Sequence, residues 1–467
     1  MQQSSSPETV VGRWWLPEHR WDRFAVVAIA VGAVFRIVWI LVVHPPVDFV
    51  YSDMGGYVTR AERLASGGPV GPDDAFFPPG THMLLAAPIK IFGAETGLWA
   101  AAILWCALSI AVVWSSWRLA RLLLTPAAAG ITAALCALWP LFITYGGYFT
   151  SETPALAFML AALWCGVLAT RRDGRRAVVL ALLSGLLGGV AAAVRPQFLI
   201  NILILAVVVA FAFRRRFGPL VGFAVGLSVV LMLAVVHNSV AAGQPTGLAT
   251  NGGLNFWFGH CEAKQVTTFD DRGVQTAQFT NSVANLINRG DDYVFNNVDI
   301  WDEEFFYNLG WECIEQDNAS HVFRSARNVL DMTATTIPFP QSEWPGGMRD
   351  VVQAANVTYA VLLPWLVIES LFLIVRRRRA GEPSGELFLL LNLACAALLA
   401  VLVVGDPRVR SVYDVFGLAL LAALLADRFG LDGSDQAQDE SEPSARYASA
   451  ARPARTAAAR RSDATRP

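Results

Sequence analysis

The sequence predicts an all-α polytopic membrane protein with about ten transmembrane helices. The 467 residues are 54% hydrophobic and only 16% charged, whereas an ordinary soluble domain carries about 25% charged residues. Apolar runs of about 20 residues, long enough to cross roughly 30 Å of hydrocarbon, recur along most of the chain. The net charge of −2 gives no basic excess that would attract nucleic acid. This composition argues against a secreted disulfide scaffold, a disordered regulator and a nucleic-acid-binding protein.

Ten apolar runs are the candidate membrane spans. They cover residues 24–43, 98–115, 127–145, 154–170, 177–194, 198–213, 217–236, 357–375, 387–404 and 412–426. A further apolar run over residues 80–92 has the length of an interfacial or re-entrant segment.

Clusters of arginine in the short loops predict the orientation. They precede the first span and follow the second, fourth, sixth and eighth spans, at Arg13, Arg20, Arg23, Arg118, Arg121, Arg171, Arg172, Arg175, Arg176, 214–216 and 376–379. If ten spans alternate, all of these clusters lie on one side, which the positive-inside rule identifies as the cytoplasm. We therefore expect a multi-pass protein of the cell membrane with both termini cytoplasmic. The first span is long and no small-residue cleavage site follows it, which is typical of a retained signal anchor.

The predicted spans divide the chain into five regions. These are a cytoplasmic segment (1–23), a transmembrane core with a catalytic first outer loop (24–240, loop 44–97), an extracytoplasmic loop subdomain (241–350), C-terminal transmembrane helices (351–426) and a disordered cytoplasmic tail (427–467). The tail is predicted to be disordered because it has few large apolar residues. Cys261 and Cys313 share the long outer loop, where they form either a disulfide or two free thiols.

The first outer loop carries a candidate catalytic acid. Apolar residues at spacings of three and four, from Met54 through Tyr57 to Leu64, predict an amphipathic helix at the membrane interface. Asp53 stands at the start of this helix, where it is either the N-cap or a general base. Asp48, five residues earlier, either faces the same cleft or is an ordinary solvated carboxylate.

Further charged residues are predicted to lie on the same outer face. Glu152 opens a span two residues before Pro154, where it either caps the helix or lines the cleft of Asp53. Arg195, Arg408 and Arg410 run against the positive-inside trend. Their guanidinium groups either snorkel to lipid phosphate or bind the phosphate of an anionic substrate.

Taken in order along residues 24–426, these motifs resemble the GT-C glycosyltransferases. More specifically, they resemble the bacterial relatives of the protein mannosyltransferases and aminoarabinose transferases. The matching motifs are Arg36 in the first span, Asp53 with Tyr57, Pro78-Pro79 to Phe92-Gly93, Ser151-Glu152, Arg195-Pro196, Asn251-Gly-Gly-Leu-Asn255 and Gly405-Asp-Pro-Arg408-Val-Arg410.

This resemblance implies transfer of a sugar, with inversion, from a polyprenyl-phosphate donor to an extracytoplasmic cell-wall glycan, glycolipid or protein. Asp53 would be the catalytic base. The substrate-binding residues would be Asp48, Tyr57, Glu152, Arg195, Asn251, Asn255, Arg408 and Arg410, with the three arginines on the donor phosphate. Membrane lipids are the other expected partners. No metal motif with diagnostic spacing occurs. Met54 stands where many relatives carry a second acid, so use of a divalent cation stays open.

Two other classes of protein share the apolar composition. A transporter or flippase of lipid-linked sugars would also use arginines for phosphate but needs no acid beside them. Transporters usually place polar residues at mid-membrane depth, whereas the predicted spans contain few ionisable residues, chiefly Arg36 and Glu369. A non-enzymatic assembly subunit is the third class.

Overall fold

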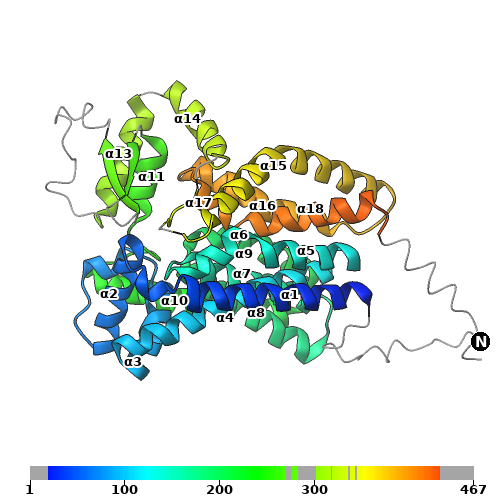
Figure 1. Cartoon of the computed structure of the whole chain (residues 1–467), viewed down its shortest axis with the longest axis horizontal. Helices are drawn as coiled ribbons and strands as arrows, with labels where there is room; N and C mark the ends of the chain where they lie inside the picture. The colour runs from blue at the N-terminus through cyan, green and yellow to red at the C-terminus, as the bar shows by residue number, and fades with distance from the viewer. Residues whose placement is uncertain are drawn as a thin grey trace, which may run out of the picture.

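The computed structural model describes residues 19–261, 263–269, 275–281, 301–316, 318–334, 337–341 and 344–431. Most of the predicted N-terminal segment and the predicted disordered tail therefore lie outside the described residues. The long helices run side by side along one direction, and shorter elements gather at one end of this bundle (Figure 1). We call this end the outer end, after the predicted orientation.

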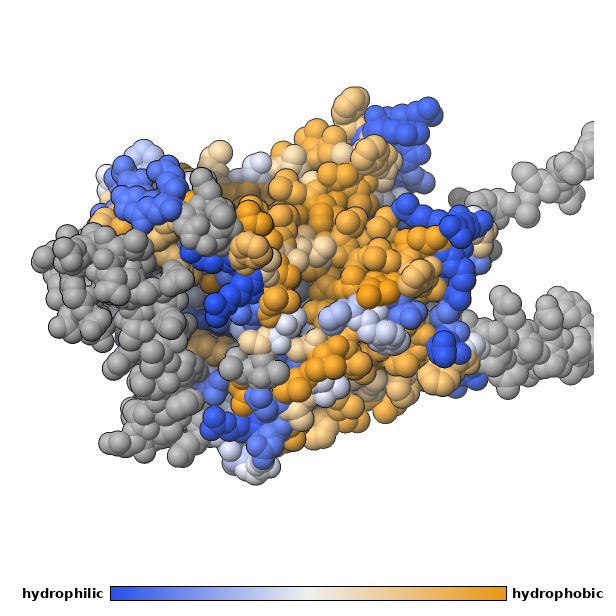
Figure 2. Space-filling model, turned by 90° about the horizontal axis from the view of Figure 1, so that it is seen from above, coloured by the Kyte–Doolittle hydropathy of each residue, from blue (hydrophilic) through white to orange (hydrophobic). Residues whose placement is uncertain are grey.

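Seven helices are long and apolar enough to cross a membrane. They are α1 (Arg20–Val38), α4 (Ala94–Leu123), α7 (Glu152–Thr170), α8 (Gly174–Val194), α10 (Phe217–Ala242), α15 (Met348–Arg379) and α16 (Gly385–Leu402). The helical membrane fold predicted from the sequence is thus confirmed. A broad hydrophobic belt covers the visible face between more hydrophilic ends (Figure 2).

The predicted count of ten spans is not confirmed. Helices α5 (Pro126–Leu138) and α6 (Pro140–Thr144) belong to a pair bent by 53°, which makes an eighth span if it is counted as one. Helix α9 (Leu199–Ala212) has only 14 residues and α18 (Asp414–Arg428) only 15. Hydropathy recognised these runs as apolar, but the helices they form are shorter than a full span.

The buried guanidinium of Arg36 stabilises the bend between α5 and α6. Pro140 has no backbone N–H, so the carbonyl of Cys136 loses its helical donor. Arg36 replaces the missing donor: its Nη2 donates to the Cys136 carbonyl (3.1 Å), and its Nη1 donates to the Ala137 carbonyl (2.7 Å). The arginine that stood out in the first span therefore satisfies backbone groups inside the bundle.

Ion pairs join the arginine-rich segments at the opposite, inner end. They link helix ends that are distant in sequence, namely Arg121 with Asp22 (2.8 Å), Arg377 with Glu386 (2.8 Å), Arg216 with Asp173 and Arg376 with Asp427. Arginines of the basic clusters that predicted the orientation therefore pair with acidic residues of other segments, and these pairs lie at the same end of the bundle.

The outer end is built from short helices and one small hairpin. From the first outer loop come η2 (Pro46–Asp48), α2 (Ser52–Ser66), η3 (Pro72–Ala75) and α3 (Pro79–Phe92). The helix predicted after Asp53 is therefore confirmed as α2, and the apolar run over residues 80–92 forms α3. Two helical turns, η4 (Tyr145–Gly147) and η5 (Pro196–Phe198), and α17 (Pro407–Ser411) join the spans. The long loop supplies α11 (Gly252–His260), α13 (Glu303–Gln316) and α14 (Asn318–Asp331). It also forms an antiparallel pair, β1 (Ala263–Phe269) and β2 (Gln275–Asn281), which the sequence did not predict.

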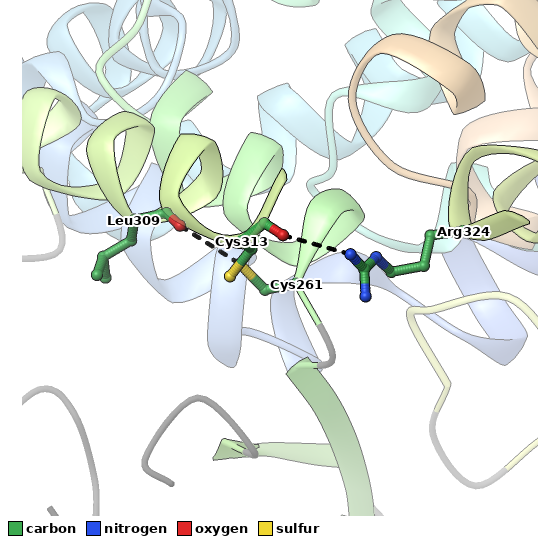
Figure 3. The surroundings of a disulfide bond; sticks show 4 residues. All are labelled: Cys261, Leu309, Cys313 and Arg324. Atoms are coloured by element: carbon green, nitrogen blue, oxygen red, sulfur yellow. Dashed lines mark hydrogen bonds between the residues drawn. A yellow bond between two sulfur atoms is a disulfide. The ribbon is translucent and has the colours of Figure 1, made fainter. Parts of the chain in front are cut away.

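A disulfide between Cys261 and Cys313 resolves the choice that the sequence left open (Figure 3). It joins the end of α11 to α13 across 52 residues of chain. Beside it, Nη2 of Arg324 on α14 donates to the Cys313 carbonyl at 3.4 Å. The three helices of the long loop are therefore tied together at this point.

Candidate active site

Four of the predicted site residues meet at the outer end of the bundle. Asp53 comes from the first turn of α2, and Glu152 is the first residue of α7. Arg195 ends α8, and Arg408 lies in α17. We call these four side chains the ionic cluster. The residues come from positions as far apart as 53 and 408, so only the folded bundle brings them together.

Arg408 bridges the two carboxylates of the ionic cluster. Its Nη1 donates to Oδ2 of Asp53 at 2.8 Å, and its Nε donates to Oε1 of Glu152. Arg195 approaches from the other side, where its Nη1 donates to the same Oε1 at 2.7 Å and to Ser151 Oγ at 3.0 Å. Glu152 therefore bridges two arginines, just as Arg408 bridges two acids.

The two acids differ in their access to solvent. The side chain of Glu152 is 1% exposed, whereas that of Asp53 is 26% exposed. Burial opposes the charged form of Arg408, but the carboxylates of Glu152 and Asp53 outweigh it and raise the pKa of Arg408 well above its ordinary value. The arrangement thus keeps a permanent positive charge beside one reachable carboxylate and one enclosed carboxylate.

The local backbone of α2 places Asp53 at this position. The N-cap position of α2 is Tyr51, and Asp53 lies in the first turn with its carboxylate bonded to Arg408. Ser52 has a positive φ of 47°, a conformation that costs about 1–3 kcal/mol in a residue other than glycine. Strain of this kind persists where surrounding contacts hold the backbone in place. Here the strained residue directly precedes Asp53, the less buried of the two acids in the cluster.

Tyr57 lies next to the ionic cluster. It is buried on α2, the helix that carries Asp53. Burial, with the nearby charge of Asp53, raises the pKa of Tyr57 to about 12. Its hydroxyl group therefore stays protonated at neutral pH.

Asp48, Asn251 and Asn255 have no bond to the ionic cluster among those found in the described residues. Asp48 lies in η2 with an exposed side chain. Asn251 is the N-cap residue of α11, and Nδ2 of Asn255 donates to its carbonyl at 2.9 Å. The preceding backbone N–H, of Thr250, donates to the Ala75 carbonyl at 2.9 Å, which attaches α11 to the first outer loop.

Arg410 points away from the ionic cluster, although it is only two residues from Arg408. Residues two apart on a helix do not face the same way. The guanidinium of Arg410 is buried, and its Nη1 donates to the Met332 carbonyl at 3.2 Å and its Nη2 to Asn356 Oδ1. Its Nε lies 3.1 Å from Oδ1 of Asp414, also buried. Arg410 therefore anchors α17 to the interior.

Asp406 and Phe339 are two further residues of the site that the sequence analysis did not single out. Oδ1 of Asp406, the N-cap of α17, accepts the backbone N–H of Arg408 at 2.6 Å. Phe339 lies under the Arg408 guanidinium, with 4.7 Å between the carbon of that group and the ring centroid. The Asp-Pro-Arg sequence was a usable signal for the cap, because aspartate commonly begins a helix before proline. No local pattern marks Phe339, since its contact joins distant segments.

A small cavity lies behind the ionic cluster. Its lining includes Glu152, Tyr145 and Ser411, and the Tyr145 hydroxyl donates to Ser411 Oγ at 3.0 Å. Across the described ranges, no group of three or more His, Cys, Asp or Glu side chains is arranged to hold a metal ion. The groups suited to an anionic ligand are the guanidiniums of Arg195 and Arg408, which match the geometry of phosphate oxygens.

The chain is similar to one protein family over part of its length and to solved structures of two kinds. Residues 77–239 match the family model described as Dolichyl-phosphate-mannose-protein mannosyltransferase. No curated protein sequence matches the chain significantly. The matched segment contains Glu152 and Arg195 but neither Asp53 nor Arg408.

Solved structures of two kinds are distantly similar. The archaeal oligosaccharyltransferase AglB from Archaeoglobus fulgidus, in complex with an inhibitory peptide and a dolichol-phosphate, is 13% identical with a TM-score of 0.46. The similarity covers 91% of this chain and 53% of AglB, so the chain spans about half the length of that protein. ArnT from Cupriavidus metallidurans, bound to undecaprenyl phosphate, is 15% identical with a TM-score of 0.39, over 86% of this chain and 77% of ArnT.

The family match agrees with the motifs that suggested a resemblance to protein mannosyltransferases. Over residues 77–239 the chain is similar to the Dolichyl-phosphate-mannose-protein mannosyltransferase family, which confirms the predicted resemblance for that segment.

Proposed function

We propose that the protein is an integral membrane glycosyltransferase that moves a sugar from a polyprenyl-phosphate donor to an acceptor outside the cytoplasm. The observation that carries this proposal is the ionic cluster, in which a solvent-reachable carboxylate adjoins two arginines at one end of an apolar bundle. The family description of residues 77–239, which names a dolichyl-phosphate sugar, supports the class of donor.

Asp53 has the position of a general base in this reaction. Its carboxylate takes the proton of the acceptor hydroxyl, and the acceptor oxygen attacks the anomeric carbon on the face opposite the phosphate. The new carbon–oxygen bond forms as the bond to the phosphate oxygen breaks, and the electron pair leaves with the polyprenyl phosphate. One displacement of this kind inverts the anomeric carbon. Glu152 is too enclosed for the same role.

Arg408 and Arg195 would stabilise the leaving phosphate. Charge-assisted hydrogen bonds to a developing anion lower the barrier most when the donors are already oriented, and Glu152 orients both arginines. A donor phosphate competes with Asp53 for the guanidinium of Arg408. Binding of the donor therefore releases the Asp53 carboxylate to accept a proton.

The Asp53→Asn variant tests this proposal. A general base contributes about 10²–10⁴ to a rate, so we expect transfer from a radiolabelled polyprenyl-phosphate sugar in isolated membranes to fall by at least about 100-fold. Glu62→Gln, which changes an exposed acid on the same helix, is the matched control and should keep full activity. Full activity of Asp53→Asn at normal expression would contradict the role of Asp53. Donor crossing a liposome membrane without glycoside formation would contradict the proposed reaction.

A further inference from the structure

Helix α14 has two faces of different character. One face is docked on the protein, because Ser325 is buried, Val329 packs against the main hydrophobic core, and Nδ2 of Asn328 donates to the Gly259 carbonyl at 2.9 Å. An adjoining face exposes apolar side chains at helical spacing. Val322 is 68% exposed, Phe323 77% and Leu330 68%. We call these three residues, with the exposed Ala326 between them, the α14 stripe.

Helix α14 lies beside a membrane-spanning helix whose nearby surface is apolar. Helix α14 packs against α16, and the outer part of α16 exposes Leu398 (45%) and Leu402 (52%). Figure 1 shows α14 inclined steeply to α15 and α16 at their outer ends, so it runs across the bundle axis. If a bilayer surrounds the membrane-spanning helices, a helix in this position lies at the outer surface of that bilayer.

The positive charge of Arg327, at the edge of the α14 stripe, also fits a membrane surface. Arg327 borders the apolar residues with a side chain that is 78% exposed, and its contact with Asp331 is long, at 3.7 Å. An exposed ion pair of that length contributes little to stability. An arginine beside an apolar helical face is the arrangement of interfacial helices, in which the cation reaches lipid phosphate while the apolar side chains enter the acyl region.

We propose that the α14 stripe binds the outer leaflet of the bilayer, with Phe323 and Leu330 among the acyl chains and Arg327 at the headgroups. This contact would hold the long-loop subdomain at the membrane surface. The chain continues from α14 to Met332, whose carbonyl accepts a hydrogen bond from Arg410 of α17. The membrane-bound helix and the helix that carries Arg408 are therefore directly connected.

Fluorescence quenching by labelled lipids tests this contact in the full-length protein. Phe323→Cys and Leu330→Cys are labelled with bimane and reconstituted into phosphatidylcholine–phosphatidylglycerol liposomes that contain lipids with a doxyl group near the top of the acyl chain. Labelling is selective, because four native cysteines are buried and the other two form the disulfide. Glu315→Cys, at an exposed polar position on α13, is the matched control.

We expect doxyl lipids to quench bimane at positions 323 and 330 at least about twofold more than at position 315, in liposomes free of polyprenyl phosphate. Equal quenching at positions 323 and 315 would overturn the proposal. Quenching that requires added polyprenyl phosphate would assign the stripe to the donor chain instead. A disulfide-linked dimer of Phe323→Cys would assign it to a second copy of the protein. The proposal does not depend on transferase activity, so it can fail while the proposed function stands.

Discussion

At the scale of single residues, one guanidinium group, that of Arg408, holds the site together through contacts with three side chains. Arg408 donates to Asp53 and Glu152 and lies over the ring of Phe339. The planar fork of arginine fixes these directions together, whereas the ammonium group of lysine is a single point charge. The type of cation at this position therefore matters as well as its charge.

This geometry predicts the effect of Arg408→Lys. The substitution keeps the charge but cannot hold both carboxylates in one rigid arrangement. Loss of one charge-assisted hydrogen bond costs about 1.5–3 kcal/mol, so we expect kcat/KM for the donor to fall about 10–100-fold. Steady-state kinetics at varied donor concentration measures this value. Phe339→Leu removes the cation–π contact alone and should cause a smaller loss. Wild-type kinetics for Arg408→Lys would show that charge alone suffices at position 408.

At the scale of elements, the five-residue helix α17 is held from inside the bundle. Arg410 bonds to Met332 and Asn356 from other segments and pairs with Asp414 at the start of α18. A buried charge that loses its partner destabilises a protein by about 3–5 kcal/mol, whereas removal of both partners costs less. The position of Arg408 therefore depends on the buried Arg410–Asp414 pair, which need not contact the substrate.

Two variants separate the anchoring role of Arg410 from a role in phosphate binding. Arg410→Gln leaves the Asp414 carboxylate uncompensated, so we expect a large fall in the midpoint of thermal unfolding in detergent. The double variant Arg410→Gln/Asp414→Asn should recover part of that midpoint and, with it, part of the transfer activity. If the double variant regains stability but no activity, Arg410 contacts the donor directly, as the sequence resemblance implied.

The sequence predicted the helices of the site better than the contacts between them. Hydrophobic spacing gave the helix after Asp53, and the order of motifs gave Glu152, Arg195 and Arg408, which the structure brings together. The direction of Arg410 could not be predicted, because the short helix α17 turns it toward Asn356 of the distant helix α15. Phe339 was missed for the same reason.

At the scale of the whole molecule, the distribution of charge separates two ends of an apolar bundle. Ion pairs such as Arg121–Asp22 and Arg377–Glu386 lie at the inner end, and the ionic cluster lies at the outer end. Of the ten spans that hydropathy predicts, seven are helices of full spanning length among the described residues. The count of ten stays a prediction, because α5 and α6 bend at Pro140 and because α9 and α18 have only 14 and 15 residues. The orientation stays a prediction, which applies the positive-inside rule to the arginines that gather at one end of the bundle.

This arrangement predicts which residues an impermeant reagent reaches in intact cells. Glu315→Cys on α13 should react with a membrane-impermeant maleimide without permeabilisation, because we expect the outer end to face out of the cytoplasm. Arg215→Cys, exposed in the loop after α9, should react only after the membrane is opened. The native cysteines give little background, since they are buried or bridged. The reverse pattern would place the ionic cluster on the cytoplasmic face and exclude an extracytoplasmic acceptor. Labelling of both positions in intact cells would contradict a single orientation.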